Sequence, residues 1–221
     1  MTDIVLFASV EDEPSREALV KIVDYVNIME NGNNPSLPRL IFEEGTPWIA
    51  GGYGDIKTKY LPAMKNMAEK NGICSIVLVD LDKEECAPSL IRQWFSLDND
   101  IPIVLHPQLI FRVAVRETES WLMADRKKFA RFMKMPIVNV PHNPDHLRDP
   151  KRKIFELISQ YCKKQRCRML PSSGSHIGED YNSSLCQFIQ SQWRPEEAAS
   201  YSDSLKRMIF SLRKLVNPQL V

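Results

Sequence analysis

The chain has 221 residues, of which 29 are basic and 28 acidic, so any affinity for nucleic acid must come from local basic patches and not from net charge. No charged segment followed by an apolar segment opens the chain, and no apolar run is long enough to span a bilayer, so we expect no membrane association. The five cysteines are odd in number and scattered, which suits free thiols in a reducing cytosol better than a disulfide framework and predicts a cytoplasmic protein.

The first predicted strand covers residues 3–10 and is followed by Glu11, Asp12 and Glu13. Apolar residues then recur at helical spacing over residues 17–29, so the unit is a strand, an acidic turn and a helix. Acidic residues are favoured in the first turn of a helix by its dipole, and this explanation suffices for Asp12 and Glu13. For Glu11, at the tip of the strand, a structural role and a functional role both remain open.

Glycine and proline divide the next part of the chain. A turn at residues 31–35 precedes a short predicted strand at 39–42, and a glycine-rich loop at 44–55 leads into a predicted helix at 57–70. The sequence Gly51-Gly52-Tyr53-Gly54 in this loop matches neither a P-loop nor a dinucleotide-binding fingerprint. We therefore expect a flexible loop at the edge of the sheet.

The most informative stretch is residues 75–82, an apolar run that ends in Asp80 and Asp82. A run of this kind without alternation is typical of a strand buried on both faces in the centre of a parallel α/β sheet. Side chains alternate along a strand, so both aspartates are expected to project to the same side at its carboxyl end, where open α/β sheets bind ligands. Two carboxylates there would repel each other unless a hard cation such as Mg²⁺ lies between them. The alternative is that the aspartates only begin a solvated turn or cap the next helix.

Two further strands are predicted after this run. A short helix at residues 89–95 leads to a predicted strand at 101–105, whose proline favours an edge position or a strand start. The next predicted strand, at 109–115, delivers Glu117 and Glu119 to the start of a helix.

The predicted α/β unit covers residues 1–135, and a helical C-terminal extension covers residues 136–221. Several prolines mark the connection between them. The extension contains three helical patterns, at residues 151–164, 181–193 and 195–216.

Basic segments could supply the patches that nucleic acid requires. They are Arg126-Lys127-Lys128, Lys151-Arg152-Lys153 and Lys163-Lys164-Gln165-Arg166-Cys167-Arg168. Exposed tryptophans could add a surface for base stacking, and the candidates are Trp94, Trp121 and Trp193. The alternative is that these charges only solvate helix faces.

The order of these motifs resembles the Toprim domain of topoisomerases, primases and OLD-type nucleases. The resemblance lies in the strand ending at Glu11, the helix, the glycine-containing loop and the later strand ending in Asp80-Leu81-Asp82. It implies a Rossmann-like, mainly parallel sheet with helices on both faces. It also implies that Glu11 is a general acid/base and that Asp80 and Asp82 bind Mg²⁺ or Mn²⁺. The chain departs from the family at Asp12, where many Toprim sequences have glycine, which allows close backbone contact at no steric cost.

A narrower resemblance extends over nearly the whole chain. Residues 112–125 are similar to a family of small bacterial Toprim-like proteins often encoded beside ABC-type ATPases. Further matching segments are Asp149-Pro150-Lys151, Tyr181-Asn182, Trp193 and Ser204-Leu205. The family has an acidic residue at the position of Glu119, so the resemblance makes Glu119 a fourth candidate carboxylate, with Glu117 as a further one.

The resulting functional expectation is a Mg²⁺-dependent nuclease that cleaves DNA or RNA. Its metal ligands and catalytic residues would be Glu11, Asp80, Asp82 and Glu119. The family context implies an effector or toxin that acts with an ABC-type ATPase partner in anti-phage defence, and a homo-oligomer is compatible with it. Two alternatives remain open. One is a non-catalytic regulatory or scaffold subunit that binds such an ATPase, and the other is a metal-dependent phosphatase or phosphotransferase.

Overall fold

A computed structural model describes residues 2–161, 167–172 and 174–220. Its centre is a five-stranded sheet in which all paired strands are parallel. Four strands follow the order β2-β1-β4-β5. The fifth, β3, pairs with the end of β1, whereas β2 pairs with the start of β1. The strands are β1 (Ile4–Val10), β2 (Leu40–Phe42), β3 (Trp48–Ile49), β4 (Cys74–Asp80) and β5 (Leu109–Ala114). The predicted α/β fold with a mainly parallel sheet is confirmed, and it is consistent with a Rossmann-like architecture.

Strand β4 is buried along its whole length, which explains why its sequence does not alternate. Its side chains enter two different hydrophobic clusters. Ile76 and Leu78 pack into the cluster on one face of the sheet, and Val77 and Val79 pack into the cluster on the other face.

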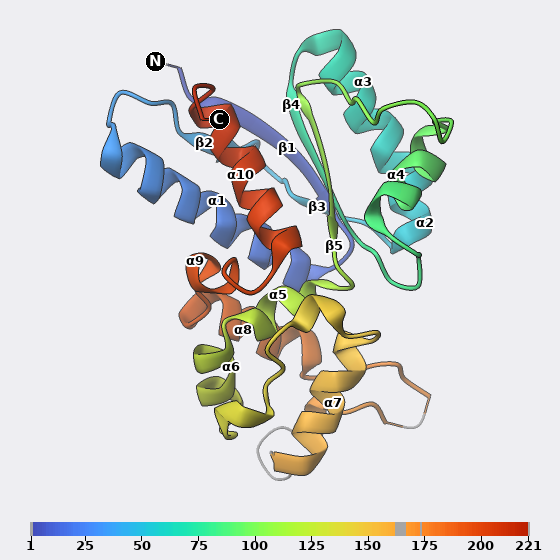
Figure 1. Cartoon of the computed structure of the whole chain (residues 1–221), viewed down its shortest axis with the longest axis vertical. Helices are drawn as coiled ribbons and strands as arrows, with labels where there is room; N and C mark the ends of the chain where they lie inside the picture. The colour runs from blue at the N-terminus through green and yellow to red at the C-terminus, as the bar shows by residue number, and fades with distance from the viewer. Residues whose placement is uncertain (1, 162–166, 173, 221) are drawn as a thin grey trace.

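One face of the sheet is covered by α1 (Glu13–Asn33) and α10 (Asp203–Val216), which are far apart in the sequence (Figure 1). Helix α8 (Tyr181–Ser191) packs against α1. Helix α1 begins directly after β1 because the Asp12 carboxylate accepts a hydrogen bond from the Ser15 amide at 2.9 Å, and Pro14 lies in its first turn.

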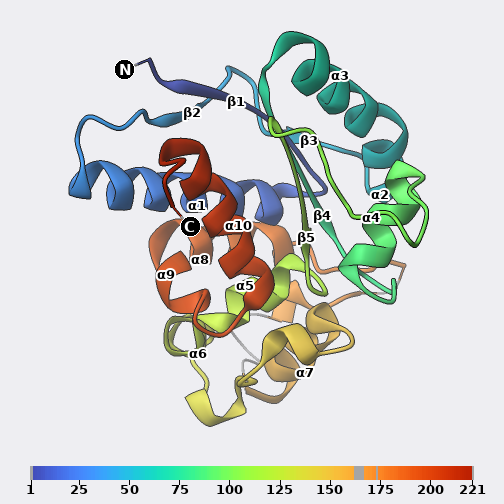
Figure 2. The ribbon, with the colours of Figure 1, turned by 45° about the horizontal axis from the view of Figure 1, so that its top comes forward.

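The opposite face is covered by α3 (Leu61–Asn71) and α4 (Ala87–Phe95), as Figure 2 shows. A short α2 (Tyr53–Asp55) and a π-helical turn (Ile56–Tyr60) lead into α3, so the predicted helix at 57–70 begins as part of a longer helical segment. Gly72 ends α3 in the left-handed conformation, with φ of 64°. Strand β3 lies within the segment that was expected to be a loop.

The remaining helices lie beyond the carboxyl ends of the strands (Figure 1). They are α5 (Thr118–Ala124), α6 (Arg126–Met133), α7 (Pro150–Tyr161) and the short α9 (Pro195–Ala198), with 3₁₀ turns at Ile137–Asn139, Pro144–His146 and Cys167–Met169. Asp125 separates α5 from α6, because its carboxylate accepts a hydrogen bond from the Lys128 amide and pairs with Arg194. The last residues of the predicted helix 151–164 and most of the basic segment beginning at Lys163 lie outside the described residues.

The predicted strand at 101–105 is wrong. This segment belongs to the connection between α4 and β5, and Val104 is 79% exposed. The Arg92 side chain donates a hydrogen bond to the carbonyl oxygen of Ile101 at 2.7 Å and to that of Asp98, which holds the connection against α4 instead of the sheet. Strand β5 then takes the position beside β4.

The predicted boundary after residue 135 stays a prediction. Both parts of the chain contribute to one hydrophobic cluster, in which Phe188, Trp193 and Leu212 from the C-terminal part join residues of α1 and the sheet. Within the described residues, none of the helices is long and apolar enough to cross a membrane.

Candidate functional site

The carboxyl ends of β1 and β4 bring two of the predicted site residues together. Glu11 directly follows β1, and Asp80 is the last residue of β4. Because these strands are parallel neighbours, their ends meet, and the Glu11 Oε1 atom accepts a hydrogen bond from the Asp80 backbone amide at 2.9 Å. Sequence reasoning predicted this convergence of Glu11 and Asp80.

Helix α5 holds the Asp80 side chain in place. Asp80 is buried, with 7% of its surface exposed, and its Oδ1 atom accepts hydrogen bonds from the Thr118 amide at 3.0 Å and the Thr118 hydroxyl at 3.2 Å. The Thr118 and Ser15 hydroxyls lie 3.0 Å apart, which links this corner to α1. The first turns of two helices therefore fix the position of Asp80.

Glu117 and Glu119 join the cluster from the start of α5. Glu119 is buried, and its Oε1 atom accepts a hydrogen bond from the Tyr181 hydroxyl at 2.9 Å. The ammonium group of Lys151 lies 3.6 Å from the same oxygen. Glu117 accepts a hydrogen bond from the Lys151 backbone amide at 2.8 Å. The first turn of α7 therefore contacts both glutamates.

Asp82 occupies a different environment from Asp80. Strand β4 ends at Asp80, and Asp82 has a left-handed backbone with φ of 49°, so the alternation of side chains along the strand does not extend to it. Asp82 is exposed, whereas Asp80 is buried. The Arg116 side chain stabilises this turn by donating hydrogen bonds to the carbonyl oxygens of Asp82 and Glu84. The strand geometry from which we expected both aspartates to project to the same side therefore does not extend to Asp82, although the Asp82 charge still acts on Glu11.

Burial and mutual repulsion raise the pKa values of these carboxyl groups. Burial raises the pKa of Glu11 to about 7, and the nearby Asp82 and Asp12 charges add to this effect. Burial also raises the pKa of Glu117 to about 7, with a contribution from Glu119. The pKa of Asp80 lies well above its usual range, because the group is buried and faces the charges of Glu119 and Glu11.

Lys151 offsets part of this repulsion. Burial raises the pKa of Glu119, and the Lys151 ammonium group opposes that change. In turn, the Glu119 carboxylate raises the pKa of Lys151, so the lysine stays charged. The described site thus contains a partly buried ammonium group among carboxyl groups whose pKa values are raised.

These pKa values predict how stability depends on pH. Because the pKa values of Glu11 and Glu117 rise from 4.5 to about 7 on folding, the folded protein binds more protons than the unfolded chain between these values. The free energy of unfolding of the metal-free protein should therefore fall as the pH increases through this window, by at most about 1.4 kcal/mol per pH unit for each group. Urea unfolding at a series of pH values in EDTA measures this slope.

The double variant Glu11→Gln/Glu117→Gln is the control for this pH dependence. It removes both titrating groups and should have a flatter profile. A profile that rises with pH, or one that the double variant leaves unchanged, would contradict the assignment of these two groups.

The donor set suits a hard divalent cation. Mg²⁺ and Mn²⁺ prefer oxygen ligands, and the site offers carboxylates whose mutual repulsion a cation would relieve. In the part of the chain that the structure describes, no three or more His, Cys, Asp or Glu side chains already surround a single point that could hold a metal. The residues present nevertheless fit such a cation by their chemistry, because Glu11, Asp80 and Glu119 are acidic, mostly buried and close in space.

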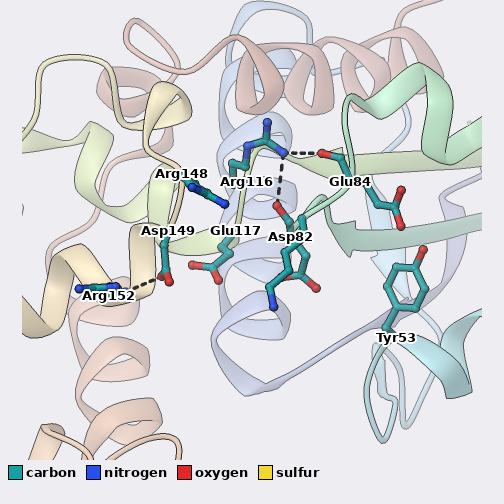
Figure 3. A pocket seen from close by; sticks show the side chains of 9 residues that line it. Tyr53, Asp82, Glu84, Arg116, Glu117, Arg148, Asp149 and Arg152 are labelled. Carbon is teal, nitrogen blue, oxygen red and sulfur yellow. Dashed lines mark hydrogen bonds between the residues drawn. The ribbon is translucent and has the colours of Figure 1, made fainter.

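A cavity of about 1020 Å³ opens beside the carboxyl groups (Figure 3). Four acidic residues and Tyr53 line it together with four basic residues. The acidic residues are Asp82, Glu84, Glu117 and Asp149, and the basic residues are Lys83, Arg116, Arg148 and Arg152. The cavity therefore places positive charge next to the acidic cluster, as binding of a phosphate group requires.

Sequence reasoning missed the specific roles of Lys151, Tyr181 and Tyr53. Lys151 lay in a predicted basic segment and Tyr181 in a segment that carried the family resemblance, but neither was assigned a contact with Glu119. The predicted stacking surface of tryptophans is absent from the described structure, because Trp94, Trp121 and Trp193 are all buried.

The other basic segments have structural roles or lie outside the described residues. Arg126 donates hydrogen bonds to the carbonyl oxygens of Val140 and Ile137, and Arg168 pairs with Glu179 and Asp180. The predicted cations outside the described residues are Lys163, Lys164 and Arg166.

Comparison of the chain with protein-family models, with curated proteins and with solved structures gave no match. The function has to be inferred from the chemistry of the site, since a Rossmann-like fold supports many unrelated activities.

Proposed function

We propose that this protein is a Toprim-like hydrolase that cleaves phosphodiester bonds of DNA or RNA and depends on Mg²⁺ or Mn²⁺. The observation that supports this most is the group of mostly buried carboxyl side chains at the carboxyl ends of β1 and β4, directly beside a cavity that contains three arginines. Such a pairing of acidic and basic groups suits a phosphate ester whose charge must be neutralised during reaction.

The metal ligands in this proposal are Glu11, Asp80, Asp82 and Glu119. The Asp80 amide orients Glu11, Thr118 orients Asp80 and Tyr181 orients Glu119, so three of the four carboxylates are held by hydrogen bonds from the protein. When bound, the divalent cation would neutralise phosphate charge and lower the pKa of bound water.

Glu11 has a second role in this proposal, and Lys151 has a role that follows from its charge. Glu11, with a pKa of about 7, can accept and donate a proton near neutral pH, as a general acid/base requires. Lys151 carries a positive charge beside Glu119 and can stabilise negative charge that develops on the phosphate.

The broader role in this proposal is that of a cytoplasmic effector that acts with an ABC-type ATPase in anti-phage defence. It is supported by the resemblance of the sequence motifs. The described cysteines, Cys74, Cys86, Cys167 and Cys186, are free thiols, as expected in a reducing compartment.

Metal binding provides the direct test of this proposal. Calorimetric titration with Mn²⁺ and Mg²⁺ should show binding to the wild-type protein, and Asp80→Asn should abolish it. The same variant should keep or slightly raise the melting temperature in EDTA, because it removes a buried carboxyl group that faces like charges. The purified protein should cleave DNA or RNA only when one of these cations is present.

The control for metal binding is Glu69→Gln, which changes an exposed carboxylate on α3 and should bind metal as the wild type does. The proposal fails if the wild-type protein binds neither cation, or if Asp80→Asn binds them equally well. Unfolding of Asp80→Asn would show instead that Asp80 is a structural residue.

A further inference from the structure

Tyr53 forms an aromatic wall on one side of the cavity. Its hydroxyl oxygen accepts a hydrogen bond from the Trp94 indole at 2.7 Å, and the two rings meet edge to face with their centroids 4.7 Å apart. Trp94 in turn packs against Phe111 of β5 at 5.4 Å. This hydrogen bond and the ring contact hold Tyr53 in place where it lines the cavity.

Two arginines of the cavity lie on the other side of the carboxyl groups. In Figure 3, Arg148 and Arg152 are well separated from Tyr53, with Asp82 and Glu117 between them. Within the described chain, the Arg148 side chain forms no ion pair, and Arg116 donates only to backbone carbonyl oxygens. Their positive charges therefore remain available to an anionic ligand.

From this arrangement we infer that the site binds single-stranded nucleic acid, with one base stacked on Tyr53 and a phosphate bound by Arg148. The inference rests on the proposed function, because it names the substrate of the same carboxylate site. In a duplex, neighbouring bases cover the face of each base, so only a single strand or an unpaired end can offer a base to Tyr53.

The size of the cavity agrees with this substrate. At about 1020 Å³, it lies at the upper limit of pockets that hold one small molecule, so it offers room for more than one nucleotide of a flexible strand. A base on Tyr53 and a phosphate at Arg148 would place the connecting backbone beside Asp82 and Glu117. The bond to be cleaved would thus lie next to the carboxylate cluster.

Fluorescence anisotropy in EDTA can test binding without cleavage. The probes are short labelled strands of DNA and of RNA, the matching duplexes, and a strand of each kind with abasic sites in place of its bases. The wild-type protein should bind both normal single strands more tightly than the duplexes. Tyr53→Ala should weaken single-strand binding by about 5- to 150-fold, the effect of losing one stacked base, whereas Tyr53→Phe should keep the affinity within about twofold.

The abasic strands separate stacking from phosphate contacts. They should bind the wild-type protein and Tyr53→Ala equally, because neither complex contains the stack. Arg148→Ala should weaken binding of normal and abasic strands alike and lower the slope of log affinity against log salt by roughly one. The control Arg131→Ala removes an exposed arginine of α6 outside the cavity and should leave binding unchanged.

Several outcomes would overturn the inference. It fails if the duplex binds as tightly as the single strands, if Tyr53→Ala binds as the wild type does, or if no strand binds at low salt. If duplex is bound preferentially and cleaved with divalent metal, the proposed hydrolase survives without this substrate. If single strands bind through Tyr53 but no cation ever produces cleavage, the binding site stands and the hydrolase proposal fails.

Thermal unfolding of Tyr53→Ala and Tyr53→Phe is the control for folding. It identifies any loss of affinity that comes from disturbed packing of Trp94.

Discussion

Replacing Glu11 with Gln should lower metal-dependent phosphodiester cleavage by about 10²- to 10⁴-fold, the range for loss of a general acid/base. Glutamine has the same shape, and its oxygen can still accept the hydrogen bond from the Asp80 amide. It can neither take up a proton nor supply a negative charge to a cation. The variant should therefore remain folded and still bind nucleic acid in EDTA, and cleavage assays with Mg²⁺ and Mn²⁺ measure the difference.

The matched control for Glu11→Gln is Glu69→Gln, the same substitution on the exposed surface of α3. It should leave cleavage unchanged. The same pair of variants can be compared in cells together with an ATPase partner. If Glu11→Gln cleaves as well as the control, Glu11 does not catalyse cleavage. If no variant cleaves and both are equally active in cells, the chain is a binding subunit.

Replacing Lys151 with Met should destabilise the protein strongly at alkaline pH and only weakly at acidic pH. The lysine lies 3.6 Å from Glu119, whose side chain is only 4% exposed. Loss of the lysine leaves this buried carboxylate without its cation, at a cost of about 3 kcal/mol near pH 8. At about pH 5, the cost should be small, because burial already raises the pKa of Glu119 and the group can take up a proton. Urea unfolding in EDTA at both pH values measures this difference.

Lys153→Met is the control for Lys151. Lys153 lies on the same helix and pairs with Glu156 at 3.3 Å, but both side chains are partly exposed. Its loss should cost at most about 1 kcal/mol and should not depend on pH in this range. A Lys151→Met variant that loses no more stability than this control, or loses equally at both pH values, would show that Lys151 does not compensate the charge of Glu119.

The centre of the sheet could be predicted because its residues carry the signal themselves. β4 is apolar throughout since both of its faces are covered, and β1 ends where the chain becomes acidic. The segment at residues 101–105 has a similar apolar composition but is not a strand. Its conformation depends on hydrogen bonds from Arg92, on a different element, and no local pattern reveals such a contact.

In the candidate site, too, some positions could be predicted from the local sequence and others depend on contacts between elements. Glu11 and Asp80 could be predicted, because each follows from the end of a recognisable strand. The position of Asp82 could not, since it depends on a left-handed turn at a residue other than glycine. Lys151 approaches Glu119 only through the packing of α7, and nothing in the local sequence distinguishes it from Lys153.

The covering of the sheet by α10 has a consequence for synthesis on the ribosome. All five strands are complete at Ala114, but the last helix on this face ends at Val216, roughly 100 residues later. At roughly 5–20 residues per second, the nascent chain spends about 5 to 20 seconds with α1 as the principal cover over the apolar face of the sheet. During this interval, Ile76, Leu78 and Ile110 are accessible to chaperones and to other nascent chains. A ribosomal pause between β5 and α10 would extend this exposure and favour aggregation over folding.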